Sequence, residues 1–160
     1  MSLFSRRTKV AIAVAALMGS SAAIAADTDT LTVTASVQPT CSIETVNNLA
    51  FGDVLFDADT NVDTTIDVFC NTVTGSLTLD GGGSGDINAR EMSDGANSLP
   101  YQLYTDTGRT TVFGDGTTGD DVSVTGSQSV TVYGQVTQAD AQAATPSAGY
   151  TDDVTVTITP

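Results

Sequence analysis

Four oxygen-bearing side chains at alternate positions are the first feature of the sequence that could do chemistry. They lie in the stretch DADTNVD and are Asp57, Asp59, Asn61 and Asp63. Their spacing matches the first ligand positions of a calcium-binding loop. The rest of that pattern is missing, because Val62 stands where the loop turns on glycine and Val68 stands where a bidentate glutamate closes it. We expect a solvated acidic turn here, with specific calcium binding as the alternative.

Two residue types limit the catalytic chemistry of the chain. Histidine is absent, which excludes Ser–His–Asp and Cys–His catalysis. The single lysine, Lys9, lies in the leader described below, so the processed chain has no side-chain amine for Schiff-base chemistry. The aspartates lie in turn-like stretches, where such side chains bond their own backbone. We predict no catalytic residues, no cofactor and no enzymatic activity; a carboxylate pair for glycoside hydrolysis is the alternative.

The first 25 residues have the three parts of a secretory signal peptide. Residues 6–9 (RRTK) are basic, residues 10–18 are apolar, and residues 23–25 (AIA) have the small side chains of a cleavage site. The apolar part is well short of the ~20 residues that span a bilayer. We expect export with cleavage after Ala25 and no membrane insertion of the processed chain.

The charge of the processed chain is strongly negative. All 19 acidic residues follow residue 25, whereas Arg90 and Arg109 are the only cationic side chains there, which leaves a net charge of −17. A field of this sign repels nucleic acids and anionic membrane surfaces. We therefore expect no nucleic-acid partner, and we attribute the charge to solubility, with a specific cationic partner as the alternative.

Two cysteines, Cys41 and Cys70, lie in the strand-like runs TCSIETV and TTIDVFC. An exported chain passes through an oxidising compartment, which favours a disulfide between them. A free reactive thiol or a metal-binding pair is the alternative, although no histidine is present to activate a thiolate or to join a metal site. We predict one disulfide between these two residues.

The processed chain alternates short strand-like runs with clusters of turn residues such as DGGGSGD and GDGTTGDD. Many short strands at this spacing indicate an all-β sandwich. The segment QADAQAA is expected to be a loop at its end, with a short helical turn as the alternative. No repeat or linker marks a second domain, so residues 40–160 are predicted to form one domain after an extension at 26–39. The expected strands are 31–37, 40–46, 64–70, 76–79, 99–105, 110–113, 122–125, 129–137 and 154–159.

Both ends of the processed chain carry the alternation of a strand with one apolar face. At the front, the apolar positions are Leu31, Val33, Ala35 and Val37. At the back, they are Val154, Val156 and Ile158. A free N-terminal tail is normally polar and disordered. The two ends therefore predict an apolar strand that precedes the domain and a last strand with one side unfilled.

Several short motifs occur in the order of a known family. They are REM at 90–92, LPYQLYTD at 99–106, FGDG at 113–116, YGQV at 133–136 and AGYTDDVTVTI at 148–158, with Cys41 ahead of LAFG at 49–52. Together they resemble the spore coat protein U domain, the fold of archaic (Csu-type) chaperone–usher pilins, over essentially the whole processed chain. Phe113 stands where that family often has Trp, and Pro160 replaces a usual terminal Tyr.

The resemblance implies an incomplete immunoglobulin-like β-sandwich that lacks its final strand. Residues 26–39 would then be a donor-strand extension, and the groove beside Val154, Val156 and Ile158 would accept a donor. Strand addition of this kind is known from chaperone–pilin complexes. The implied partners are a periplasmic pilus chaperone, an outer-membrane usher and neighbouring pilin subunits, in a homopolymer.

The function implied by the resemblance is that of a structural subunit of a surface pilus, or fimbria. Such a subunit passes through the periplasm to the cell surface and serves adhesion and biofilm formation; a shaft subunit fits better than a two-domain tip adhesin. One alternative is a spore or cyst coat protein. Another is a secreted monomeric module that binds calcium or carbohydrate, the latter at Tyr101, Tyr104 or Tyr133, although aromatic residues on strands are usually core residues.

Overall fold

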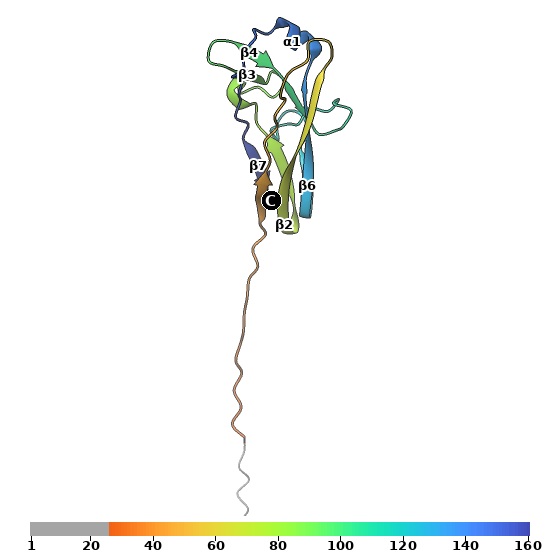
Figure 1. Ribbon diagram of the computed structural model, residues 1–160. Helices are drawn as coiled ribbons and strands as arrows, with labels where there is room; N and C mark the ends of the chain where they lie inside the picture. The colour runs from red at the N-terminus through yellow and green to blue at the C-terminus, as the bar shows by residue number, and fades with distance from the viewer. Residues whose placement is uncertain (1–25) are drawn as a thin grey trace, which may run out of the picture. The chain divides into compact units, whose positions relative to one another are not determined.

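The computed structural model describes residues 26–160, so the predicted signal peptide lies outside the described residues. These residues belong to two units, a segment that ends at Ser36 and a folded unit, Val37–Pro160. The folded unit is built from strands with one short helix and one 3₁₀ turn (Figure 1). The elements are β1 (Cys41–Val46), β2 (Thr60–Leu79), η1 (Gly82–Ser84), β3 (Glu91–Ser93), β4 (Ser98–Pro100), β5 (Gln102–Tyr104), β6 (Val122–Val136), α1 (Gln138–Ala143) and β7 (Val156–Thr159).

A long antiparallel pair of strands, β2 and β6, is the centre of the fold (Figure 1). β1 pairs with the middle of β2, where Cys41 lies opposite Cys70. β7 pairs with the end of β2, where Val156 lies opposite Leu79. β5 pairs with β6, and β3 and β4 form a separate two-stranded sheet. β1 and β7 therefore pair with successive stretches of the same central strand.

An irregularity in β2 keeps its apolar side chains directed at one core. The pairing of β2 with β6 shifts register between Cys70 and Gly75. Before the shift the buried positions are even-numbered, from Ile66 to Cys70, and after it they are Leu77 and Leu79. Because side chains alternate between the two faces of a strand, the extra residues change which positions point inward. Both parts of β2 thus contribute to the same core.

The all-β sandwich predicted from the sequence is confirmed, although several strands differ from those expected. The predicted strand at 99–105 is divided between β4 and β5, which belong to different sheets. The predicted pairs of strands at 64–70 and 76–79 and at 122–125 and 129–137 are each part of one strand, β2 and β6. The predicted strand at 110–113 is wrong, since this stretch takes part only in isolated bridges, at Val112 and Phe113. Phe113 is nevertheless fully buried. The aromatic residue that replaces the family's Trp is therefore a core residue.

The loop predicted for QADAQAA is wrong, because this stretch forms α1. The hydroxyl of Thr137 accepts a hydrogen bond from the main-chain N–H of Asp140 at 3.1 Å, which is the usual interaction of a helix N-cap. The side chain of Asp59 accepts a second bond, from the main-chain N–H of Gln138 at 2.8 Å. The helix is thus capped in part by a residue that is distant in the sequence.

Candidate functional site

An apolar groove of about 970 Å³ runs along one side of the folded unit. It lies between the segment after β1, residues 46–56, and the segment that leads into β7, residues 144–156. The residues of its floor are core residues, each at most 5% exposed: Ile66, Leu79, Leu99, Leu103 and Val132. The groove therefore opens directly onto the hydrophobic core.

The two walls of the groove carry partly buried apolar side chains that pack against the core. On one wall these are Leu49, Phe51 and Val54, and on the other they are Tyr150, Val154 and Val156. Among the described strands, β7 pairs with β2 alone, and so does β1. A strand edge beside an apolar channel offers main-chain hydrogen bonds and apolar contacts to an extended chain. The groove has the chemistry of a site for strand addition.

The three residues predicted to form the acceptor strand separate into two groups. Val154 and Val156 line the groove. Ile158 also packs against the core, but it lies opposite Leu77 and is not one of the lining residues. The groove thus ends between Val156 and Ile158.

The groove is closed where β1 and β7 approach each other beside the disulfide. The predicted Cys41–Cys70 disulfide is present and joins residues that lie directly opposite each other on β1 and β2. A Cβ atom at Gly75 would lie 2.6 Å from Sγ of Cys41, 2.8 Å from Sγ of Cys70 and 3.2 Å from the main-chain oxygen of Thr159. Only glycine fits between the disulfide and the end of β7. The lining of the groove includes no residue of β1 before Val46 and none of β7 beyond Val156, so the groove does not extend to this end.

Two aspartates tie the segment before β7 to the core. Asp152 accepts a hydrogen bond from the Tyr101 hydroxyl at 2.6 Å, and Asp80 accepts one from the main-chain N–H of Thr155 at 2.8 Å. Burial, together with the bond to Asp152, raises the pKa of Tyr101, so the phenol stays protonated and donates. Burial acts to raise the pKa of Asp80 as well, but the hydrogen bonds from Thr155 and Gly82 bring it below its ordinary value. These bonds hold one wall of the empty groove in place.

Arg90 is the structural residue whose role the sequence reasoning missed. Its side chain is fully buried. Its guanidinium donates to the main-chain oxygens of Leu79 at 3.0 Å, Asp80 at 2.9 Å and Phe113 at 2.9 Å, and to Gln102 Oε1 at 2.7 Å. Burial lowers its pKa. The available signal was that Arg90 is one of only two cationic side chains in residues 26–160, which hold all 19 acidic residues.

The residues predicted to form a donor strand are exposed. Leu31, Val33 and Val37 are 87%, 82% and 79% exposed, and Ala35 is exposed too. Residues 26–40 have no strand pairing. Large apolar side chains repeated at alternate positions of a segment outside the described strands are a common mark of an interaction surface.

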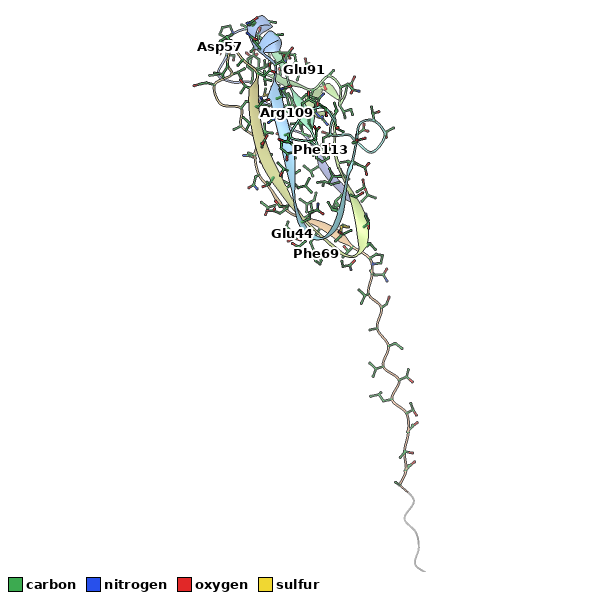
Figure 2. The ribbon with its side chains drawn as sticks, turned by 90° about the vertical axis from the view of Figure 1, so that its right-hand side faces the viewer. Glu44, Asp57, Phe69, Glu91, Arg109 and Phe113 are labelled. Carbon is green, nitrogen blue, oxygen red and sulfur yellow. A yellow bond between two sulfur atoms is a disulfide. The ribbon has the colours of Figure 1, made fainter. Side chains whose placement is uncertain are left out.

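The calcium candidates are not brought together as ligands. Asp57 is exposed at the surface (Figure 2). Within residues 26–160, no group of three His, Cys, Asp or Glu side chains is placed to hold a metal ion. The other three candidates have protein partners: Gln138 for Asp59, Gln135 for Asn61 and Arg109 for Asp63.

The three candidate tyrosines for carbohydrate binding do not share one surface. Tyr101 lies in the groove, edge-to-face with Phe51 at a ring separation of 6.0 Å. Tyr104 and Tyr133 lie opposite each other on β5 and β6. The guanidinium of Arg109 lies 5.8 Å from the Tyr133 ring centre.

No helix among the described residues is long and apolar enough to cross a membrane.

The fold and the groove define an all-β domain with an accessible strand edge. Residues 27–157 match the family model of the Spore Coat Protein U domain, and the chain belongs to this family. No curated protein matches the chain. A solved structure with a similar chain is the chaperone–tip adhesion subunit pre-assembly complex from the archaic chaperone–usher Csu pili of Acinetobacter baumannii, at 20% identity and a TM-score of 0.55. The match covers 76% of this chain but 40% of that one, and it shows a common fold.

Proposed function

We propose that this protein is a structural subunit of a surface pilus and that its subunits join by donor-strand exchange. The observation that carries the proposal is the open apolar groove, found in a chain that also bears an exposed apolar strand pattern. Family membership and the fold shared with a chain of a Csu pilus complex support it. In this mechanism, residues 26–39 of one subunit fill the groove of the next beside Val154 and Val156.

The energy of such a joint rests on the apolar side chains of the donor. Burying Leu31, Val33 and Val37 contributes roughly 1.5–3 kcal/mol each before costs. Each main-chain hydrogen bond to a groove edge adds about 0.5–1.5 kcal/mol net. Ordering the tail costs roughly 1–2 kcal/mol per residue, which offsets much of the hydrogen bonding. A single charge among the apolar positions should therefore abolish donation.

The partners follow from the same groove. The similar structure is a pre-assembly complex of a chaperone with a pilus subunit. By extension, a periplasmic chaperone covers the groove of this chain first, and at an outer-membrane usher the tail of the next subunit replaces it. The product is an extracellular homopolymer that serves adhesion and biofilm formation, with this chain as a shaft subunit and without enzymatic activity.

The donor role is tested by Val33→Asp, with Thr32→Asp as the matched control on the opposite face of the same strand. Surface extracts are run on a gel without boiling. We expect Val33→Asp to abolish the ladder of high-mass polymers while monomer remains, and Thr32→Asp to retain the ladder. A normal ladder from Val33→Asp would overturn the proposal.

The acceptor role is tested by combining two defective subunits. Val33→Asp retains an intact groove, and Val156→Asp retains an intact tail. When both are expressed together, the tail of the second should fill the groove of the first and stop there, giving dimers and no longer polymers. Formation of the disulfide in both variants checks that they fold. Absence of dimers from two folded variants would count against strand exchange.

The family match favours one second candidate, a spore or cyst coat protein. Subunits of a coat could use the same strand exchange, so gel ladders do not separate the two functions. Negative-stain microscopy of the assembled material does. We expect thin filaments at the cell surface; a continuous layer would identify a coat.

A further inference from the structure

The tail leaves the folded unit through a clamp made by Asn71. Its Nδ2 donates to the main-chain oxygen of Gln38 at 2.8 Å, and its Oδ1 accepts from the main-chain N–H of Thr40 at 3.0 Å. Its own main-chain N–H donates to the oxygen of Thr40 at 3.0 Å. The chain is therefore attached to the folded unit from Gln38 onward. Val37, the last apolar position of the predicted donor strand, comes immediately before this clamp.

The clamp leaves almost no free chain between a donor strand and its own folded unit. The three residue steps from Val37 to Thr40 span at most about 11 Å when fully extended. If Val37 lies in the groove of a neighbour, which is the step that rests on the proposed function, the two folded units must lie within that distance. Consecutive units are then close enough to touch.

The direction in which a tail leaves the groove determines which surfaces of two consecutive subunits face each other. A tail in the groove does not reach the end where Gly75 lies between the disulfide and Thr159, because no residue of that end lines the groove. The groove extends in the other direction to α1, where Ala141 and Ala144 line it. A tail in the groove thus leaves beside α1. The disulfide end of each donor therefore faces the α1 end of its acceptor.

Each of these two ends presents exposed apolar side chains. Phe69 lies opposite Ser42 on β1, beside the clamp, and is 42% exposed. At the α1 end, Leu55 is 48% and Phe56 is 59% exposed. The main-chain oxygen of Phe56 accepts a hydrogen bond from Gln142 of α1 at 2.8 Å, so its ring projects from a fixed backbone. Figure 2 shows Phe69 and Asp57, the residue after Phe56, at opposite ends of the folded unit.

We propose that Phe69 of one subunit packs against Leu55 and Phe56 of the next, a body-to-body contact beside the donated strand. The occupant of each patch is a second copy of this chain, because the short tether brings these two ends together. Asp57 and Asp67 place negative charge near the two patches. Screening by salt should therefore strengthen the contact, and low ionic strength should weaken it.

The contact is tested by cross-linking assembled fibres of a Phe56→Cys, Phe69→Cys double variant. After mild oxidation and boiling in detergent without reductant, we expect covalent multimers that collapse to monomer when reductant is added. Each single variant should give at most background dimers. A matched control pairs Phe56→Cys with Thr131→Cys, which lies in the middle of β6, and should stay monomeric after boiling.

The outcomes separate this contact from the strand exchange itself. If unboiled wild-type extracts contain no polymer, the proposed function fails. If polymer forms but the double variant does not cross-link, the contact is overturned. Should the double variant not assemble, Phe69→Ser is examined by microscopy beside Thr131→Ser. We expect polymers of Phe69→Ser to form and to be more sharply bent than those of the control, and equal curvature would overturn the contact.

Discussion

Two regions at the edge of the core differ in how completely their side chains are covered. One surrounds Arg90, and the other is the groove. Around Arg90, a fully buried charge has its hydrogen bonds made to main-chain oxygens of β2 and of the segment at Phe113. Within the described part of the chain, no buried side-chain polar atom lacks a partner. Along the groove, by contrast, Val154 and Val156 pack against the core yet remain partly exposed.

This difference shows that the opening is local. A loosely packed protein would also leave polar groups unsatisfied, since each one costs free energy when buried. Here the polar network reaches the edge of the groove, where Tyr101 and Asp152 bond to each other. The groove is therefore a defined feature of a well-ordered fold, and hydrogen bonds hold its wall at Asp152 and Thr155.

The largest expected effect on stability comes from replacing the buried Arg90 with alanine. The main-chain oxygens of Leu79, Asp80 and Phe113 would lose their donor, at about 1–3 kcal/mol each when buried. We expect the free energy of unfolding to fall by more than about 4 kcal/mol, measured by urea denaturation. Arg109→Ala is the control, because its ion pair to Asp63 is partly exposed and should be worth about 0–1 kcal/mol. Equal losses in the two variants would show that the buried guanidinium of Arg90 adds no more to stability than the partly exposed one of Arg109.

Removal of the disulfide ranks second. The two cysteines are 29 residues apart, and the chain-entropy model assigns about 3.6 kcal/mol to a loop of that size. We expect the Cys41→Ser, Cys70→Ser double variant to lose about this much unfolding free energy. It should also open the closed end of the groove, because Gly75 and Thr159 then lose a rigid neighbour. Hydrogen exchange of the amides of β7 measures the second effect; protection equal to the wild type would show that the disulfide does not support that end.

The all-β fold, the apolar pattern that precedes the domain and the apolar last strand were predictable from local patterns. The alternation around Val156 and around Val33 is visible in the sequence, and two cysteines in a chain that is expected to be exported favour a disulfide. The role of residues 26–39 as a donor strand remains a prediction, and the exchange of strands remains a proposal. What the sequence did not reveal depends on contacts between distant segments. The capping of α1 by Asp59 and the burial of Arg90 beneath Phe113 are examples.

Glycine positions explain why the long strands were missed. Gly75 and Gly126 lie at predicted strand breaks, but β2 and β6 continue through both. Gly126 has a φ of 63° and still pairs with Cys70. A glycine in a strand can mark a bulge or a close approach rather than an end. Gly75 is such a case, and its reason, the adjacent disulfide, is visible only in three dimensions.

The third effect concerns Tyr101, where the polar network meets the groove. Tyr101→Phe removes a hydrogen bond to the carboxylate of Asp152, worth about 1.5–3 kcal/mol. The folded-state pKa of Tyr101 lies above its ordinary value, so the unfolded chain loses this proton first as the pH rises. Stability from this group is thus complete below about pH 10 and is lost at higher pH. Above about pH 10, the free energy of unfolding should fall less steeply with pH for Tyr101→Phe than for the wild type. An identical pH dependence in the two proteins would exclude this role.

The smallest effect on the free subunit, and the sharpest test of the contrast, is at Val156. Leu77 is fully buried, so Leu77→Ala should cost about 2–5 kcal/mol of unfolding free energy. Val156 is only partly buried in the empty groove, so Val156→Ala should cost less than about 1 kcal/mol there. The cost of Val156→Ala rises if a donor strand covers Val156, because the same truncation then leaves a cavity beneath the donor. A peptide of residues 27–39 added in trans should therefore stabilise the wild type more than Val156→Ala, while it stabilises Leu77→Ala by as much as the wild type. Thermal shifts with and without the peptide measure this. Equal shifts in all three proteins would mean that the donor does not lie against Val156, even if the groove and the tail are both real.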